Sequence, residues 1–468
     1  MQKGGPPEEP TLNPAFITRR PYENVSWPLY KGKPGRDQAA SYPQAFRAPP
    51  RVFRAAARLM LANCRDWGQC CRPGAPSRPP GEGFSHLKTV SLNGVVKAMR
   101  VTVERNDFLK ALGHVQSVVE RRNTVPILSN VLVQAKDGVL RLTATDLDME
   151  VVETARKANI AEDGAATAPA HLLHDIVRKL PYGAELRLEQ PDEGRLAIIT
   201  GRSRFMLPAL PPQDFPDMKA GEMTHEFAIS PDDLKFLIER TRFAISTEET
   251  RYYLNGIYFH HVEEGNLLRA VATDGHRLAR AEADAPAGCE GMPGIIVPRK
   301  TVLELVKLID AAEDDIGVAM SDSKIRFSID GVVLTSKLID GNFPDYERVI
   351  PTANDKRLEV DTRLFAQAVD RVSTVSSEKG RAVKLAISED RLVLSVNNPE
   401  AGSAEEELAC SYDAEPVEIG FNARYLLDIT GQFEGDTTLF LLNDGGSPTI
   451  MRDAGGERAI YVLMPMRV

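Results

Sequence analysis

The chain has 468 residues, of which 43% are apolar and 26% are charged, and its formal net charge is −9. This length allows about three domains, and no stretch approaches the roughly 20 successive apolar residues that a membrane-spanning helix needs. The five cysteines form no C-x-x-C pair, so they predict neither a disulfide framework nor a zinc site, which fits a reducing cytosol.

Residues 1–98 differ in composition from the rest of the chain. They hold 15 of the 57 Lys and Arg, only 6 of the 66 Asp and Glu, and 14 of the 32 prolines. Such a basic, proline-rich segment is typical of disorder. A short basic amphipathic helix over 51–61 would instead indicate an organelle transit peptide. We expect a disordered extension with no assigned function, and we expect the biological chain to start at Met99, where a regular pattern begins.

From Met99 onward, the same pair of helices is predicted three times. The first helix of each unit follows from apolar positions spaced i, i+4, i+7 and i+10, namely Phe108, Leu112, Val115 and Val118, then Leu234, Ile238, Thr241 and Ala244, then Phe365, Val369, Val372 and Val375. The second helix follows from Leu173, Ile176 and Leu180, then Val302, Leu305 and Ile309, then Leu426, Ile429 and Phe433.

Alternating runs typical of strands lie between the helices and after each second helix. In each unit one run ends in a polar turn, at Asp146, Asp274 and Asn398, with offsets of 128 and 124 residues. Three landmarks that keep one spacing argue against the alternative, a coincidental periodicity in a mixed protein. The sequence therefore predicts an α+β fold of three repeated domains, over 99–223, 224–355 and 356–468.

Positive charge is concentrated in the predicted helices. The segments 105–122, 170–179, 230–246, 298–309, 361–377 and 422–433 hold 15 Lys and Arg against 10 Asp and Glu, whereas the other 284 residues of 99–468 hold 27 against 50. Helices that carry scattered Lys and Arg suit a polyanion that is contacted through its phosphates. If two chains formed a ring lined by twelve helices at roughly 9 Å spacing, the hole would be about 24 Å wide, enough for a duplex about 20 Å across.

Residues 99–468 resemble, over their full length, the bacterial DNA polymerase III beta subunit, the replicative sliding clamp. The resemblance is carried by MRVTVER (99–105), VPILSN (125–130), TDLDMEV (145–151), GRSRF (201–205), RYYLNG (251–256), VATDGHRLA (271–279), IVPRK (296–300), TSKLIDGNFPDY (335–346), NNPE (397–400), IGFNARYLLD (419–428) and YVLMPMR (461–467). It implies the DNA clamp fold and a head-to-tail homodimeric ring of six domains, with helices inside and antiparallel sheets outside.

The resemblance also implies partners and a location. A bacterial clamp slides on double-stranded DNA without reading its sequence. It binds the polymerase III catalytic subunit, the clamp loader, and other DNA polymerases and repair proteins through short peptide motifs. It is cytoplasmic, and it is associated with the nucleoid during replication.

A peptide-binding pocket is implied between the second and third domains. The residues that match the family's pocket are Leu254, Thr273, Gly275, His276, Arg277, Leu278, Pro344, Arg348, Val349, Tyr425, Met464, Pro465, Met466 and Arg467. The Met-Pro-Met-Arg end offers adaptable apolar contacts, and Arg277 offers a partner for a peptide carboxylate or carbonyl. The alternative is that Leu278, Val349 and Met464 are plain core residues. Glu347 places an acid where clamps often have a base.

DNA contacts are implied for a second set of residues. They are Arg122 on the loop after the first helix, Arg251, Tyr252 and Tyr253 in RYYLNG, and Arg299 and Lys300 at the start of a helix. Tyrosines beside an arginine suit wedging against a duplex or stacking on a base. The alternative is that the two tyrosines are strand aromatics that pack on the core.

Two other function classes compete with a clamp. An enzyme would use Asp274 and His276, or Asp146, Asp148 and Glu150, whose spacing of two places three carboxylates on one face of a strand. No nucleotide-binding, metalloprotease or nucleophile-elbow motif accompanies them. A scaffold that never meets DNA would leave the basic helices unexplained. We therefore expect no catalytic residues, no metal and no cofactor.

Overall fold

The computed structural model describes residues 99–467 apart from 156, 193, 220 and 377–380. The expected extension over 1–98, with its transit-peptide alternative, lies outside the described residues. The described residues contain no helix that is long and apolar enough to cross a membrane.

Each of the three repeats contains two α-helices that pack on each other. The helices are α1 (Arg105–Gln116), α2 (Ala170–Lys179), α3 (Pro231–Arg242), α4 (Arg299–Ile309), α5 (Thr362–Ser373) and α6 (Ala423–Thr430). Side chains that precede the first helical turn accept backbone N–H groups, as Ser230 does for α3 and Asp361 for α5, so these helices begin where a capping residue stands.

Strands precede the first helix of each repeat, separate its two helices and follow the second. The first repeat has β1 (Arg100–Glu104), β2 (Asn130–Lys136), β3 (Val139–Thr145), β4 (Met149–Ala155), β5 (Ala158–Glu162), β6 (Gly164–Pro169), β7 (Glu185–Asp192), β8 (Arg195–Thr200) and β9 (Ser203–Pro208). The second has β10 (His225–Ile229), β11 (Gly256–Val262), β12 (Leu267–Thr273), β13 (Arg277–Asp284), β14 (Ile295–Pro298), β15 (Ile316–Met320), β16 (Lys324–Ile329) and β17 (Val332–Lys337). The third has β18 (Lys356–Asp361), β19 (Ala382–Ser388), β20 (Arg391–Asn398), β21 (Gly402–Ala409), β22 (Val417–Asn422), β23 (Thr437–Leu442), β24 (Thr449–Asp453) and β25 (Ala459–Leu463).

Four 3-10 turns lie outside these elements in the described residues. They are η1 (Pro126–Ser129), η2 (Pro212–Asp214), η3 (Glu249–Leu254) and η4 (Tyr346–Val349). The last two lie before β11 and in the connector that follows β17, and both contribute to the candidate site below.

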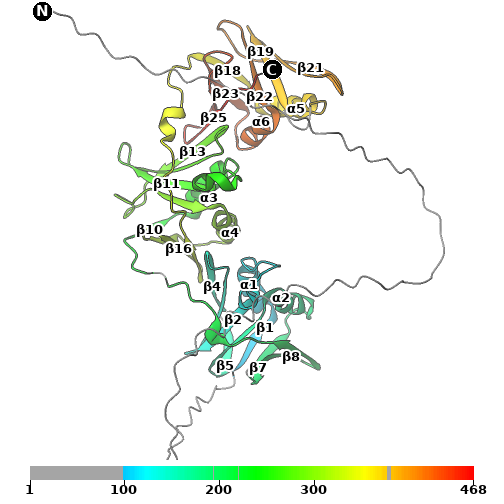
Figure 1. Ribbon diagram of the computed structural model, residues 1–468, viewed down its shortest axis with the longest axis vertical. Coiled ribbons are helices and arrows are strands. Elements are labelled where there is room, and N and C mark those ends of the chain that lie inside the picture. The colour runs from blue at the N-terminus through cyan, green and yellow to red at the C-terminus, as the bar shows by residue number, and fades with distance from the viewer. Residues whose placement is uncertain (1–98, 156, 193, 220, 377–380, 468) are drawn as a thin grey trace, which may run out of the picture. The chain divides into compact units, whose positions relative to one another are not determined.

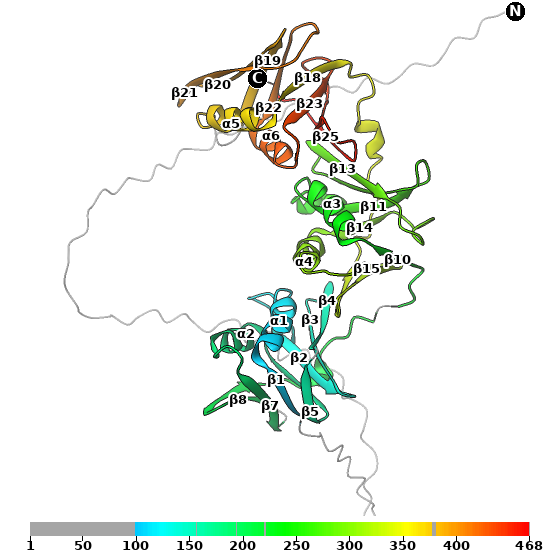
Figure 2. The same ribbon diagram turned by 180° about the vertical axis from the view of Figure 1, so that it is seen from behind.

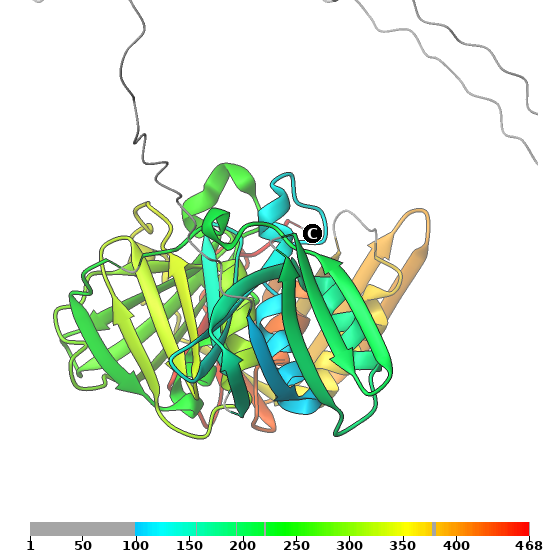
Figure 3. The same ribbon diagram turned by 90° about the horizontal axis from the view of Figure 1, so that it is seen from below.

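The strands form four antiparallel sheets, which we name A to D. Sheet A has the order β5-β1-β7-β8-β9, sheet B β10-β15-β16-β17-β4-β3-β2-β6, sheet C β14-β11-β12-β13-β25-β24-β23-β18, and sheet D β21-β20-β19-β22. Within each repeat, the helix pair lies on one side of the strands, as the two opposite views show (Figures 1 and 2). The view from below shows strands of the first repeat crossing in front of its helices (Figure 3).

Sheets B and C each run from one repeat into the next. The last strand of the second repeat, β17, pairs with β4 of the first, and Glu150 lies opposite Thr335. The last strand of the third repeat, β25, pairs with β13 of the second in the same way, and Leu278 lies opposite Val462. Each joint therefore uses up two sheet edges that a single repeat would expose.

The three polar landmarks of the sequence occupy equivalent turns. The Asp146 carboxylate accepts the N–H groups of Asp148 and Met149, and the Asp274 carboxylate accepts those of His276 and Arg277. Asn398 accepts the N–H of Glu400. A short polar side chain that bonds to the backbone two residues on stabilises such a turn, which explains why the landmarks keep their spacing.

Several helices end earlier than their apolar spacing predicts. Val118 and Ala244 are buried, and Val375 and Phe433 pack partly buried on the core, but all four lie beyond the last residue of α1, α3, α5 or α6. Residues 117–122, which carry Arg121 and Arg122, are therefore not helical. The prediction was wrong at these ends because the four residues are apolar for another reason: they pack on the core after the helix has ended, so their spacing does not show that the helix continues.

Candidate functional site

A small apolar cavity lies where the second repeat meets the third. Its volume is about 150 Å³, and it is lined by Leu254, Thr273, Gly275, Arg277, Leu278, Pro344, Tyr346, Val349, Val462 and Met464. The β13–β25 pairing brings the second and third repeats together here, and η3, the β12–β13 turn and the connector with η4 form the remaining walls. The cavity thus needs four segments that are far apart in the sequence.

Eight of the ten lining residues belong to the pocket that the sequence predicts. Tyr346 and Val462 were missed, although each had a signal in the sequence: Val462 stands two residues before Met464, and Tyr346 stands two residues after Pro344. Leu278 and Leu254 are buried, Met464 is half-buried and Val349 is 39% exposed. The core alternative therefore fits Leu278 and fails for Val349.

Arg277 is committed to contacts within the protein. Its Nε lies 3.1 Å from the Asp274 carboxylate and its Nη1 2.6 Å from that of Asp428, while its Nη2 donates to the carbonyl of Phe243 at 2.7 Å. The guanidinium also lies over the Tyr425 ring, 4.4 Å from its centroid. Each of the three guanidinium nitrogens thus has a partner within the protein, and the pairing of Arg277 with a peptide carboxylate or carbonyl stays a prediction that would use the remaining N–H groups of Nη1 and Nη2. The side chain forms a wall and joins the two repeats.

The other predicted pocket residues surround the cavity without lining it. The His276 ring lies nearly parallel to that of Tyr425 with centroids 6.4 Å apart, and Arg348 is exposed and pairs with Asp345 at 2.7 Å. The C-terminal segment is held by its backbone, because Met464 N–H donates to His276 and Met466 N–H donates to Gly420, at 3.0 and 2.7 Å. Pro465 is half-buried and Arg467 is exposed.

The six residues predicted to meet DNA lie around the start of α4. The backbone N–H of Arg299 donates to the carbonyl of Asn255, the residue after η3, at 2.9 Å. Through this contact, the segment with Arg251, Tyr252 and Tyr253 lies next to Arg299 and Lys300. Lys300 in turn contacts Glu120, two residues before Arg122.

The six residues differ in whether their side chains already have partners within the protein. Lys300 Nζ pairs with Asp146 and with Glu120, and Arg251 pairs with Glu248 at 2.7 Å. Burial by itself would lower the pKa of Lys300, but the hydrogen bonds to Asp146 and Glu120 outweigh it, so the pKa is raised above its ordinary value. Across the described part of the chain, the side chains of Arg122 and Arg299 have no ion pair.

The two tyrosines lie in a 3-10 turn, so the alternative that they are strand aromatics was wrong. Tyr252 is 54% exposed, and its ring meets that of Tyr253 edge to face with centroids 5.8 Å apart. Tyr252 therefore offers part of an aromatic surface to solvent.

The carboxylates of the enzyme alternative do not converge. Asp146 and Asp148 lie in the turn before β4, and Glu150 lies in β4 itself, so the expected row of three on one strand face was wrong. Asp146 is occupied by its turn and by Lys300, and Asp148 pairs with Lys337. The described residues contain no group of three or more His, Cys, Asp or Glu that could hold a metal ion.

Comparisons with known proteins agree with this geometry. Models of the DNA polymerase III beta subunit match its N-terminal domain at residues 99–219, its central domain at 228–345 and its C-terminal domain at 347–467. The beta sliding clamp of Caulobacter vibrioides is 55% identical over 373 residues, which cover 79% of this chain and 100% of the relative. Two solved clamps, one from Bartonella birtlesii bound to griselimycin and one from Caulobacter crescentus with polyethylene glycol at its proposed tethering region for the beta motif, are each 55% identical with a TM-score of 0.77, over 79% of this chain and 100% of theirs. The chain therefore belongs to the DNA polymerase III beta subunit family, and it is a DNA sliding clamp, a processivity factor without catalytic activity of its own.

Proposed function

We propose that two copies of this clamp close head to tail into a ring around duplex DNA, by pairing β9 of one copy with β21 of the other. At both internal joints, the last strand of one repeat pairs with the strand that follows the landmark turn of the preceding repeat, as β17 does with β4 and β25 with β13. The same rule leaves β9 of the first repeat and β21 of the third without a partner, at the outer edges of sheets A and D. This pair of matching edges is the observation that carries the proposal.

Equivalent register predicts which residues would face each other. At the first joint Val332 lies opposite Glu153. Ser203 occupies the place of Val332, because it pairs with Thr200 across the β8–β9 turn as Val332 pairs with Ile329 across the β16–β17 turn. Glu406 occupies the place of Glu153, because it pairs with Leu394, which stands 252 residues after Leu142, the partner of Glu153. Ser203 would thus lie opposite Glu406 of the second copy, and Arg204 opposite Glu405 of the second copy. Arg202, in the turn before β9, and Glu407 are exposed at the same two edges, so the charges of the edges are complementary.

The proposed ring holds DNA by encircling it. The six helices carry Arg and Lys in excess over Asp and Glu, 13 against eight, which suits contacts with phosphates at any position along a duplex. Retention on closed circular plasmid followed by release after linearisation would support the proposal. Equal retention on the two forms would contradict it, because groove binding survives linearisation.

We further propose that the cavity takes short peptide segments of the polymerase III catalytic subunit, the clamp loader, and other polymerases and repair proteins. Apolar walls, an exposed Val349 and a half-buried Met464 are typical of a site that accepts several peptides. Griselimycin is then a convenient probe, because a 55% identical clamp is solved in complex with it.

Deletion of residues 464–468 tests the pocket. The deletion removes the Met464 side chain and the two backbone hydrogen bonds of the segment, but neither β9 nor β21. We expect griselimycin binding, measured by calorimetry, to fall at least tenfold while light scattering still reports a dimer. Undiminished binding would show that the probe binds elsewhere.

The domain division over 99–223, 224–355 and 356–468 is part of the same proposal. It is supported by the first strands of the second and third repeats, since β10 starts at His225 and β18 at Lys356. Because the clamp relatives are bacterial proteins, we propose action in the cytoplasm, at the nucleoid during replication.

A further inference from the structure

A row of polar side chains crosses three strands of sheet C in the second repeat. His260 on β11 lies opposite Arg269 on β12, and Arg269 lies opposite Glu282 on β13. The neighbouring residues along these strands, such as Phe259, Leu268 and Ala283, belong to the core cluster that packs on the helices. The polar row therefore lies on the opposite face of the sheet, beneath the connector that leads into the third repeat.

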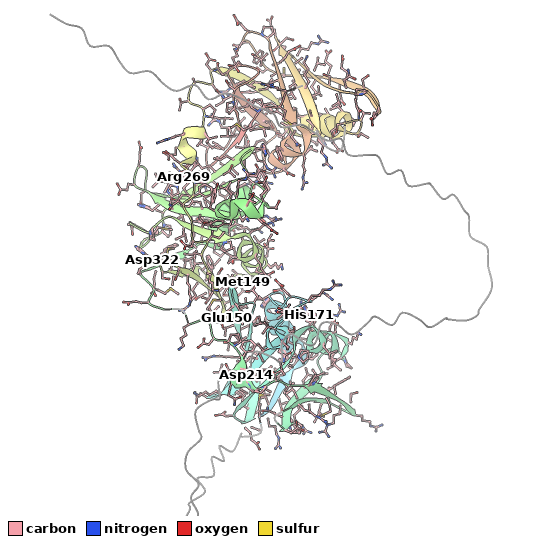
Figure 4. All side chains as sticks on the ribbon, in the orientation of Figure 1. Met149, Glu150, His171, Asp214, Arg269 and Asp322 are labelled. Atoms are coloured by element: carbon pink, nitrogen blue, oxygen red, sulfur yellow. The ribbon has the colours of Figure 1, made fainter. Side chains whose placement is uncertain are left out.

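The connector is fastened to this row by Tyr346. Its hydroxyl oxygen lies 2.9 Å from His260 Nε2 and accepts a hydrogen bond from Arg269 Nη1 at 2.7 Å. Arg269, labelled in Figure 4, also bonds to Glu282 at 2.6 Å and to Glu347 at 2.8 Å, and its side chain is only 10% exposed. Below the hydroxyl, the Tyr258 ring stacks between His260 and Phe343, with centroids 5.0 and 4.8 Å apart.

The distances of these hydrogen bonds favour a neutral imidazole. Arg269 can only donate, so the Tyr346 oxygen accepts its hydrogen bond, and the Tyr346 O–H group is left to donate to another acceptor. His260 Nδ1 lies 3.3 Å from the carbonyl of His261 and donates to it, which leaves Nε2 as the acceptor of the Tyr346 O–H. The other acceptor near this hydroxyl, Glu347 Oε1, is 3.5 Å away.

Tyr346 is also a wall of the peptide cavity, next to Pro344 and Val349 of the same connector. We infer that His260 is a positioning residue of the peptide pocket: as a neutral acceptor it fixes the Tyr346 hydroxyl, and through it the connector wall that a bound peptide would touch. This inference rests on the proposed peptide-binding function of the cavity. Glu347, which the sequence marks as unusual for a clamp, belongs to the same network.

Protonation of His260 would disturb the network in two ways. The imidazole would lose its acceptor nitrogen, and a further cation would stand beside Arg269, which pairs with Glu282 and Glu347. Burial lowers the pKa of His260, and the nearby Arg269 acts in the same direction, whereas Glu347 and Glu282 oppose it. The histidine is therefore neutral at pH 7.5, and we expect its protonation on acidification to weaken peptide binding.

Three single substitutions separate these effects. His260→Phe keeps a ring against Tyr258 and removes the acceptor, so griselimycin binding should weaken about three- to tenfold at pH 7.5. His260→Gln keeps an acceptor that does not titrate, so its affinity should be close to that of the wild type at pH 7.5 and should not fall at pH 5.5. His261→Gln is the matched control, because His261 bonds to Asn266 instead, and it should keep the wild-type loss of affinity on acidification.

Tyr346→Phe tests whether the Tyr346 hydroxyl is the group through which His260 positions the connector. It should weaken binding as His260→Phe does, and the double variant should be no worse than either single variant. Hydrogen exchange of residues 339–350 provides a readout that needs no ligand, and we expect faster exchange in His260→Phe and in the wild type at pH 5.5. Unchanged exchange and unchanged affinity in His260→Phe would overturn the inference. If the wild type failed to bind griselimycin while the exchange behaved as expected, the proposed pocket function would fail and the positioning of the connector would stand.

Discussion

Lys337 and Asp148 join the first two repeats twice, once through their backbones and once through their side chains. The Lys337 N–H donates to the Asp148 carbonyl at 2.8 Å, and Lys337 Nζ lies 3.0 Å from the Asp148 carboxylate. At the second joint the backbone bond recurs, from Met464 to His276 at 3.0 Å, but the uncharged Met464 side chain forms no ion pair with His276. The groove at the first joint is accordingly lined by charged residues that include Lys300 and Asp146, whereas the cavity at the second joint is apolar apart from Arg277, Thr273 and the Tyr346 hydroxyl. One backbone arrangement thus supports two surfaces of different chemistry.

Charge reversal at β9 is expected to weaken the proposed dimer. Arg204→Glu places an acid opposite Glu405 of the second copy, so we expect a dimer dissociation constant at least tenfold higher, measured by analytical ultracentrifugation. Adding Glu405→Arg on the same chain should restore much of the affinity. Arg141→Glu changes an exposed arginine away from both edges and serves as the control. A dimer that is unaffected by Arg204→Glu would exclude the predicted register.

Arg122 and Lys300 are expected to behave differently when replaced by glutamate. Arg122 is exposed and has no ion pair in the described part of the chain. Arg122→Glu should therefore weaken binding to DNA and reduce the slope of log affinity against log salt concentration by about one, the loss of one phosphate contact. Its melting temperature should be unchanged. Lys300→Glu instead leaves Asp146 and Glu120 facing a third acid, and should lower the free energy of unfolding by about 1 kcal/mol. Salt titrations of DNA anisotropy and thermal unfolding distinguish the two. Equal melting temperatures of the two variants would contradict the role of Lys300 in the joint.

Val349→Asp tests the apolar wall of the cavity without disturbing the core. Because Val349 is 39% exposed, we expect little loss of stability, but the charge should lower griselimycin affinity at least tenfold. Leu172→Asp, at an exposed leucine outside the cavity, is the matched control and should bind as the wild type does. Calorimetry provides the affinities, and a Val349→Asp variant that binds normally would exclude this wall from the site.

Glu150 is expected to make the first joint sensitive to pH. It is buried at the β4–β17 pairing, where it accepts the N–H of Met218, and burial raises the pKa of its carboxyl (Figure 4). The native state therefore binds this proton more tightly than the unfolded state does, so the free energy of unfolding falls as pH rises through the pKa. Glu150→Gln should raise the free energy of unfolding by about 1 kcal/mol at pH 7.5 and give no gain near pH 4.

Chemical denaturation at the two pH values measures this difference. Glu263→Gln, at an exposed position in the turn after β11, controls for the change in net charge. A gain that is equal at both pH values would show that Glu150 does not titrate between them.

The sequence alone determined the repeat and the kind of fold. Apolar spacing identified all six helices and the landmark turns at Asp146, Asp274 and Asn398, because helix periodicity and turn chemistry are local properties of the chain. The family motifs also identified most of the cavity lining, since these motifs coincide with the segments that meet at the second joint.

The tertiary structure decided which groups remain free to act. Arg277 and Lys300 look like available cations in the sequence, but strand pairing between repeats brings Asp428 to the first and Asp146 to the second. Tyr346 becomes part of the cavity wall because the connector folds over sheet C and meets His260 and Arg269. Partners separated by more than 75 residues depend on register and chain path, which no local pattern records.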